Sequence, residues 1–317
     1  MSIIYSNAIV SVRSSKMLTV DRIRRMVAAQ TAADAAKILF ECGYDEQLLT
    51  TQPERDDLII NAERKRTIEE FNKLCPDKNV KYCVMARFDY HNAMTLYGRE
   101  ANQVDPDALY SLGNIDLDKL KTAIAKKSYT ALPDPMASAL SRLDKNSEPS
   151  PIQTEVELSR AMYQDIFANA KRNIAEYYRA EVDMMNLRVA AKSKLFGQKY
   201  ENMFVEGGTI AESSVRSLLT KNPNDVKVAV ANPKYSKVLD ALVTSMNAVN
   251  LVEFENVAGE TLIEISKNNS DDLFSINMLF YWFIKKMEEL RIVKTILMGK
   301  KFGKTKEELR EDLRGVL

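Results

Sequence analysis

The sequence predicts a nearly all-α protein made of three helical repeats of roughly 100 residues each. Glycine and proline, which favour turns and interrupt helices, occur only 10 and 9 times in 317 residues, below their usual shares of about 7% and about 5%. Apolar residues recur at helical spacings, and segments that begin predicted helices match one another along the chain. Folds that depend on tight glycine turns are therefore disfavoured.

The clearest helical stretch runs from residue 152 to residue 204, where no proline interrupts the chain. Its start carries three signals: Ser150 as the N-cap, Pro151 at the first helical position, and Gln153 to complete a capping box. Apolar residues on one face are three, four or seven positions apart, namely Val156, Tyr163, Ile166, Ala170, Ile174 and Tyr177. We expect one very long helix or two helices in series.

Two further segments repeat the capping-box pattern, Thr209 with Glu212 and Thr305 with Glu308. We expect each pair to start a helix. Strand-like alternation is confined to two short runs, residues 227–231 and 251–254. The sequence therefore predicts very little β-structure.

An internal repeat becomes visible when predicted helix starts are superposed. The segment that begins at Leu18 matches the one at Ile115 with a shift of 97 residues, and the one at Ile210 with a shift of 192. An apolar residue followed by a basic one coincides in all three segments: Ile23 with Arg24, Leu120 with Lys121, and Val215 with Arg216. We predict three repeats, which comprise residues 1–111, 112–206 and 207–317.

A second landmark closes each repeat. Asp89 and Asn92 in the first repeat match Asp183 and Asn186 in the second, while the third has Glu289 and Ile292. Residues three apart share one face of a helix. Because the third repeat lacks the asparagine, a threefold chemical site would be incomplete. We therefore favour a structural hydrogen bond over a chemical role for these residues.

The composition argues against most classes of enzyme. Lys and Arg total 45 and Asp and Glu total 44, so the net charge of +1 implies no bulk attraction to nucleic acid or to an anionic membrane. His91 is the only histidine, and the three cysteines form no CxxC pair. The acidic pairs at 56–57 and 271–272 do not complete a DDxxD motif. We expect no catalytic residue, no cofactor and no metal site.

A near match to a phosphate-binding loop lies at residues 299–305, Gly-Lys-Lys-Phe-Gly-Lys-Thr. Such a loop needs four residues between its glycines, and Met298 occupies the position that requires the first glycine. The apolar residues before it follow a helical rather than a strand period. We expect a helix that ends at Gly299, a turn, and a new helix from Thr305.

Features that bear on location favour an intracellular protein. The N-terminus has no basic stretch followed by an apolar one, so we expect no signal peptide. The most apolar window, residues 273–284, is shorter than the ~20 residues that a helix needs to cross a bilayer. Cys42, Cys75 and Cys83 are irregularly spaced, as is typical of reduced thiols.

Several segments of this sequence occur together in one known family. They are residues 5–13, 32–44, 89–92, 186–188, 289–300 and 307–310. In this order and spacing they resemble the C subunit of bacterial and archaeal V/A-type ATPases, and the similar d subunit of eukaryotic vacuolar ATPases. The resemblance extends from about residue 5 to about residue 314. It departs from the family at Met94, where a basic residue is expected, and at Ile292 and Lys294, which replace Asn and Arg.

The resemblance implies a non-catalytic subunit with three similar helical domains, arranged as a funnel with pseudo-threefold symmetry. It also implies a place on the cytoplasmic face of the membrane, between the central axle, formed by the D and F subunits, and the rotor ring of proteolipid subunits. There the protein would couple the axle to H⁺ or Na⁺ translocation, and it would be a monomer in isolation. Two alternatives are a helical scaffold or adaptor of another assembly, and a helical enzyme with an unrecognised site.

Four residues are candidates for binding a partner: Arg13, Arg24, Arg25 and Trp282. The arginines belong to the clearest local excess of positive charge, which suits an acidic partner surface, although a solvated helix face explains any one of them better. Trp282 lies in an aromatic run, residues 280–283, that either docks on the ring or fills the core. The core is the favoured interpretation.

Overall fold

The computed structural model describes residues 2–99, 103–146, 149–197, 203–230, 232–314 and 316. Among these residues the regular structure is helical and no strand occurs, so the prediction of an all-α fold is confirmed. Residues 227–230 lie instead in helix α12 (Pro223–Val230), residues 251–254 lie at the start of α14 (Val252–Ser266), and residue 231 lies outside the described residues. Runs of four or five residues are too short to distinguish a period of 2 from a period of 3.6.

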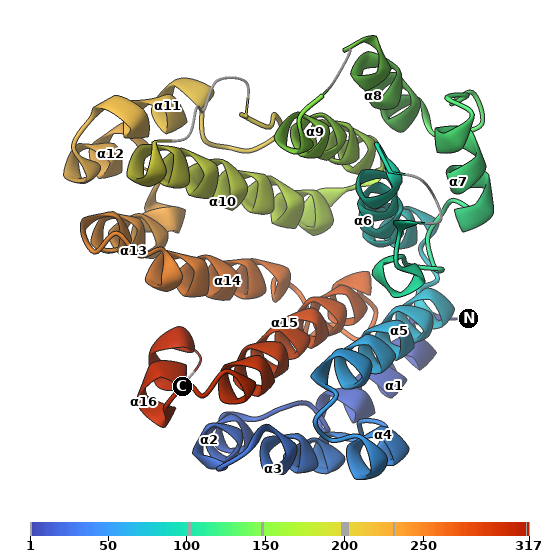
Figure 1. The fold of residues 1–317 in the computed structure, drawn as a ribbon, viewed down its shortest axis with the longest axis vertical. Coiled ribbons are helices and arrows are strands. Elements are labelled where there is room, and N and C mark those ends of the chain that lie inside the picture. The colour runs from blue at the N-terminus through green and yellow to red at the C-terminus, as the bar shows by residue number, and fades with distance from the viewer. Residues whose placement is uncertain are drawn as a thin grey trace. The chain divides into compact units, whose positions relative to one another are not determined.

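The chain divides into two compact units, whose helices are labelled in Figure 1. Unit 1 comprises residues 1–76 and 231–317, and unit 2 comprises residues 77–230. Unit 1 contains α1 (Ile3–Ser14), α2 (Val20–Ala28), α3 (Ala32–Lys37), η1 (Ile38–Cys42), α4 (Glu46–Thr51), α5 (Asp56–Leu74), η4 (Pro233–Tyr235), α13 (Ser236–Asn247), α14, α15 (Ile276–Lys301) and α16 (Lys306–Asp312). Unit 2 contains α6 (Lys78–Leu96), η3 (Pro106–Ala108), α7 (Leu117–Ala125), α8 (Asp134–Lys145), α9 (Pro151–Asn169), α10 (Arg172–Phe196), α11 (Glu212–Thr220) and α12.

Unit 1 is organised around α15, which lies beside α5 and also contacts α1 and α3 (Figure 1). Met26, Ala35 and Leu39 from the N-terminal helices pack in one fully buried cluster with Val293 and Ile296 of α15. Burying an apolar side chain of the larger kind contributes about 1.5–3 kcal/mol. Residues from both ends of the sequence therefore share one core.

In unit 2, α6 and α8 both pack on α9, and α11 packs on α10. The α6–α9 contact contains partnered polar groups: the Tyr82 hydroxyl donates to the Asp165 carboxylate at 2.9 Å, and Tyr90 donates to it at 3.4 Å. Burial raises the pKa of Asp165, and the two hydroxyl groups oppose that rise. Because a buried carboxylate is costly without donors, these bonds favour one alignment of the two helices.

Capping boxes mark the starts of two helices, α9 in unit 2 and α16 in unit 1. Ser150 and Gln153 form the predicted capping box at the start of α9. The helical stretch that follows is two helices in series, because the chain turns between Asn169 and Arg172, whose φ is 48°. The capping box of Thr305 at the start of α16 is also confirmed.

Two predicted helix boundaries are wrong. The N-cap of α11 is Ala211 rather than Thr209, because the Thr209 hydroxyl donates to a carboxylate of α10. Helix α15 continues two residues past Gly299, and the residue with left-handed backbone is Gly303, at a φ of 75°. Gly299 is buried inside the helix, where a Cβ would lie 2.5 Å from Leu309 Cδ2. Its small size is needed for packing and not for the turn.

Candidate functional site

The most regular feature of the structure is a contact between a long helix and a short one, which we call a joint. The short helices α2, α7 and α11 are each nine residues long and begin at residues 20, 117 and 212. These starts are separated by the same shifts that align the sequence repeats. The three joints are α15–α2 in unit 1, and α6–α7 and α10–α11 in unit 2.

In the α6–α7 joint, Asp89 of α6 holds the chain just before α7. Its buried carboxylate accepts hydrogen bonds from the backbone N–H groups of Asn114, at 2.9 Å, and Ile115, at 3.1 Å. Burial raises the pKa of Asp89 to about 6, although these hydrogen bonds oppose the rise. Almost one turn further along α6, Asn92 exchanges two hydrogen bonds, of 2.8 and 2.9 Å, with the backbone of Tyr110. The two side chains thus satisfy backbone groups that have no helical partner.

The α10–α11 joint has the same arrangement. Asp183 accepts hydrogen bonds from the backbone N–H groups of Thr209, at 2.8 Å, and Ile210, at 2.9 Å, and from the Thr209 hydroxyl at 2.6 Å. Asn186 exchanges two hydrogen bonds, of 2.8 and 2.9 Å, with the backbone of Val205. Both Asp183 and Asn186 are buried. These acid and asparagine pairs are therefore engaged in structural hydrogen bonds.

A glycine two residues before each attachment point permits the close approach in unit 2. A Cβ on Gly113 would lie 2.0 Å from Asp89 Oδ1, and a Cβ on Gly208 would lie 2.2 Å from Asp183 Oδ1. Any side chain at these positions would displace the carboxylate from its backbone donors. Aspartate and glycine therefore act as a matched pair in both joints of unit 2.

The α15–α2 joint uses glutamate instead. Glu289 accepts hydrogen bonds from the backbone N–H of Leu18, at 2.7 Å, and from the Tyr44 hydroxyl, at 2.9 Å. Leu18 is the counterpart of the attachment points in unit 2, but the residue two before it is Lys16 rather than glycine. The extra methylene of glutamate lengthens its reach, so this joint keeps the backbone contact without a glycine.

The acid of the α15–α2 joint belongs to a buried cluster of charges. Lys286 Nζ lies 2.8 Å from Glu63 Oε1, also pairs with Glu289, and lies 4.7 Å from the centre of the Tyr44 ring. Arg66 pairs with Glu63 at 2.7 Å, so two cations balance two carboxylates. Burial and the nearby Glu289 raise the pKa of Tyr44, which keeps its hydroxyl protonated as a donor. The cluster joins α5, α15 and Tyr44, which lies two residues after η1.

Lysines of the long helices hold the far ends of two short helices. At α2, Lys300 Nζ donates to the carbonyl oxygens of Val27, at 3.0 Å, and Ala29. At α11, Lys194 Nζ donates to the carbonyl oxygen of Lys221. Each of these lysines lies eleven residues after the acid of its joint. An ammonium group at a helix C-terminus also complements the helix dipole.

Helix α7 ends differently. The residue eleven positions after Asp89 is Glu100, which lies outside the described residues. The backbone closes α7 with a Schellman motif, in which the N–H groups of Lys127 and Ser128 bond to carbonyls of the last turn at 3.1 and 3.0 Å. Lys127 has a φ of 50°, and a left-handed conformation costs a residue with a side chain about 1–2 kcal/mol.

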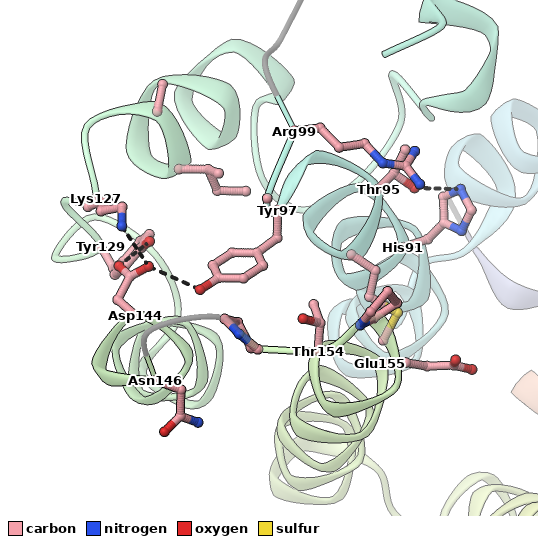
Figure 2. A pocket seen from close by; sticks show the side chains of 16 residues that line it. His91, Thr95, Tyr97, Arg99, Lys127, Tyr129, Asp144, Asn146, Thr154 and Glu155 are labelled. Atoms are coloured by element: carbon pink, nitrogen blue, oxygen red, sulfur yellow. Dashed lines mark hydrogen bonds and ion pairs between the residues drawn. The ribbon is translucent and has the colours of Figure 1, made fainter. Parts of the chain in front are cut away.

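A cavity of about 770 Å³ lies between the ends of α6 and α7 (Figure 2). Tyr97 from the α6 end and Tyr129 from beyond α7 line it, and their hydroxyls donate to the Asp144 carboxylate at 3.1 and 2.7 Å. Lys127 Nζ lies 3.5 Å from the same carboxylate. Burial and the neighbouring Asp144 raise the pKa of Tyr97 to about 12. The cavity thus combines aromatic rings, a carboxylate and the carboxyl end of α7.

The three candidate arginines lie on exposed parts of unit 1. Arg13 pairs with Glu70 at 2.6 Å. Arg25 makes two hydrogen bonds to Glu41, of 2.9 and 2.6 Å, so part of the positive excess is neutralised within the chain. Arg24 is exposed on the same helix. Their role in binding a partner stays a prediction.

Trp282 does not lie on an exposed rim. It is 3% exposed, and its neighbours Phe280 and Phe283 are buried as well. The Phe283 ring lies 4.7 Å from the ring of Phe71 on α5. The aromatic run therefore fills the core of unit 1, and Trp282 is not accessible to a partner while unit 1 is folded.

The remaining polar candidates form no recognisable chemical centre in the part of the chain that the structure describes. There, no group of three or more His, Cys, Asp or Glu side chains is placed to hold a metal ion. His91 is exposed, and its Nε2 lies 3.1 Å from the carbonyl oxygen of Ala108. No helix in the described ranges is long and apolar enough to cross a membrane.

The sequence alone indicates the acids of the joints but not the lysines at their far ends. The acids recur in all three repeats, whereas Glu100 breaks the lysine pattern in the first. A comparison of the second and third repeats alone would reveal that Lys194 and Lys300 have the same spacing from their acids. Because the first repeat lacks this lysine, the pattern is not apparent when all three repeats are compared.

Comparisons with known proteins cover nearly the whole chain. A family model described as the ATP synthase (C/AC39) subunit matches residues 6–312. The C subunit of the A-type ATP synthase of Halobacterium salinarum is 22% identical over 326 residues, which cover 92% of each chain. The C subunit of the V-type sodium ATPase of Enterococcus hirae is 19% identical over 323 residues, which cover 98% of this chain and 97% of the relative. The chain therefore belongs to the ATP synthase (C/AC39) subunit family, as a C subunit of the V/A-type ATPases.

Proposed function

We propose that this protein is the non-catalytic central-stalk subunit of a rotary ATPase. It would connect the D and F subunits of the axle to the proteolipid rotor ring and so couple the axle to H⁺ or Na⁺ translocation. The observation that carries the proposal is the family match over residues 6–312. The proposed location is the cytoplasmic face of the membrane, where the protein would be a peripheral part of the complex, and the isolated chain would be a monomer.

The proposal includes three domains, residues 1–111, 112–206 and 207–317, arranged with pseudo-threefold symmetry as a funnel. The equal lengths and regular spacing of α2, α7 and α11 support it. The joints support it too, because Asp89, Asp183 and Glu289 hold equivalent N–H groups of Ile115, Ile210 and Leu18. The α15–α2 joint connects the third repeat back to the first, as a closed cycle of three repeats requires.

A part that transmits torque must resist bending, and the joints suit that task. Helices α10 and α15 contain 25 and 26 residues, whose backbone hydrogen bonds are largely internal to each helix. Two of the three short helices are fixed at both ends by a single long helix. These contacts limit hinge motion between a long helix and its short neighbour.

Co-purification tests the proposal. A tagged version of this chain is expected to retain the D and F subunits and the proteolipid ring from a host membrane extract, and the isolated chain is expected to hydrolyse no ATP. Retention of a different assembly would favour the scaffold alternative. Turnover of ATP by the purified chain would contradict the non-catalytic role.

The candidate arginines are tested by charge reversal. Arg24→Glu combined with Arg25→Glu is expected to weaken retention of the complex at physiological salt, because these residues lie in the local positive excess. Lys65→Glu combined with Lys73→Glu, on the exposed side of α5, is the matched control. Equal retention by both double variants would remove the arginines from the proposed binding surface.

A further inference from the structure

We infer that the cavity at the α6–α7 joint is a docking pocket for a lysine or arginine side chain of a partner chain, an inference that rests on the proposed function. At the other two joints, a lysine of the same chain occupies the corresponding place. Lys300 reaches the carboxyl end of α2, and Lys194 reaches the carboxyl end of α11. At α7, the corresponding place is bordered by a cavity of about 770 Å³.

The end of α6 lacks both basic residues that follow the acid in the other long helices. Five residues after the acid, α10 has Arg188 and α15 has Lys294, whereas α6 has Met94. Eleven residues after the acid, Lys194 and Lys300 correspond to Glu100 in the first repeat. Met94 lines the cavity. At these two positions the first repeat has no positive charge, whereas the second and third repeats each have two.

The walls of the cavity suit a cation. Ile124 and Ala125 contribute the carboxyl end of α7, which is the negative end of the helix dipole. The Asp144 carboxylate lies between the hydroxyls of Tyr97 and Tyr129. Aromatic faces attract ammonium and guanidinium groups, most strongly in desolvated sites.

Two cations of the described residues, Lys127 and Arg99, line the cavity. The Lys127 side chain is 70% exposed, so its ammonium lies at the mouth of the cavity. Figure 2 shows the guanidinium of Arg99 beside Thr95 and His91, on the opposite side of Tyr97 from Lys127. The volume lies within the about 300–1,000 Å³ typical of ligand pockets, so a basic side chain enters together with part of its neighbouring residues.

Filling the pocket from within the chain tests the inference. Met94→Lys supplies an ammonium group from the cavity wall, and Glu155→Lys places one at an exposed position of the wall. We would measure the affinity of each purified variant for the D and F subunits and for the proteolipid ring, each prepared without this protein. Both lysine variants are expected to bind about tenfold more weakly than the original chain, because the partner's cation is displaced and repelled. Met94→Leu, the uncharged control of similar volume, is expected to bind normally.

The outcomes separate the inference from the proposed function. Normal affinity of two folded lysine variants would overturn the docking pocket and leave the central-stalk role intact. Failure of the original chain to bind any of these subunits would overturn both. If Met94→Lys does not fold, Glu155→Lys decides, because Glu155 is exposed and its replacement leaves the core unchanged.

Discussion

The joints of unit 1 and unit 2 hold equivalent helix starts with different residues. In unit 2, an aspartate accepts hydrogen bonds from a backbone segment that contains a glycine, as Asp183 does beside Gly208. In unit 1, the longer Glu289 reaches the Leu18 N–H past Lys16, and it is balanced by the buried Lys286. The comparison teaches that the repeat preserves the position of a carboxylate relative to a backbone N–H, while the residues that place it there vary together.

The largest expected effect on stability comes from a substitution that disrupts the α15–α2 joint of unit 1. Lys286→Met removes the cation between Glu63 and Glu289, so two buried carboxylates face each other, and we expect the free energy of unfolding to fall by about 3–5 kcal/mol. Urea unfolding followed by circular dichroism measures the change. Lys285→Met, an exposed neighbour on α15 whose ammonium lies 5.6 Å from the centre of the Tyr281 ring, is the control and is expected to change stability by less than about 1 kcal/mol. Equal effects of the two variants would show that the buried cluster does not stabilise unit 1.

The raised pKa of Asp89 makes the free energy of unfolding depend on pH through the α6–α7 joint of unit 2. Because burial raises its pKa from 3.8 to about 6, the folded state binds the proton more tightly than the unfolded state does. The tighter proton binding contributes up to about 3 kcal/mol to the free energy of unfolding. This contribution is fully present below about pH 4 and is lost as the pH rises through 6. Asp89→Asn does not titrate, so the difference in unfolding free energy between the two proteins should change by this amount from pH 4 to pH 7. A constant difference would contradict the raised pKa.

Glycine substitutions test whether the hydrogen bonds of Asp183 depend on the small size of Gly208. Gly208→Ala places a Cβ 2.2 Å from Asp183 Oδ1, and displacement of the carboxylate is expected to cost about 2 kcal/mol. Gly259→Ala is the matched control, because nothing lies within 4 Å of its Cβ and it lies inside α14. That variant should gain up to about 1 kcal/mol from helix propensity. Thermal unfolding compares the two, and a shift in the same direction for both would contradict the matched pair.

The helices and the acid positions could be predicted from the sequence because both depend on local spacing. Periodicity alone identifies the helical stretch after Ser150, although not its break near Arg172. The helix boundaries that were predicted wrongly depend on contacts with residues distant in the sequence. Thr209 fits a capping box, but Asp183, 26 residues earlier in the sequence, takes its hydroxyl. Gly299 and Gly303 both fit a helix end, and only the packing of Leu309 against Gly299 decides between them.

The smallest expected effect concerns how the short helices end. At position 127, where φ is 50°, glycine relieves the left-handed strain, so Lys127→Gly should be more stable than Lys127→Ala by about 1–2 kcal/mol. Comparing these two variants cancels the loss of the contact with Asp144. At position 221 the backbone is extended, with ψ of 161°, so Lys221→Gly should be less stable than Lys221→Ala by about 0.5–1 kcal/mol.

Denaturant unfolding of the four variants measures both differences under one condition. A reversal of sign between the two positions is the signature of two distinct ways of ending a short helix: a backbone motif at α7, and a lysine from the neighbouring long helix at α11. The same sign at both positions would mean that α7 ends as α11 does. The first repeat, which has Glu100 where the others have Lys194 and Lys300, would then have no structural compensation for the missing lysine, and the α6–α7 joint would not be the exception among the three.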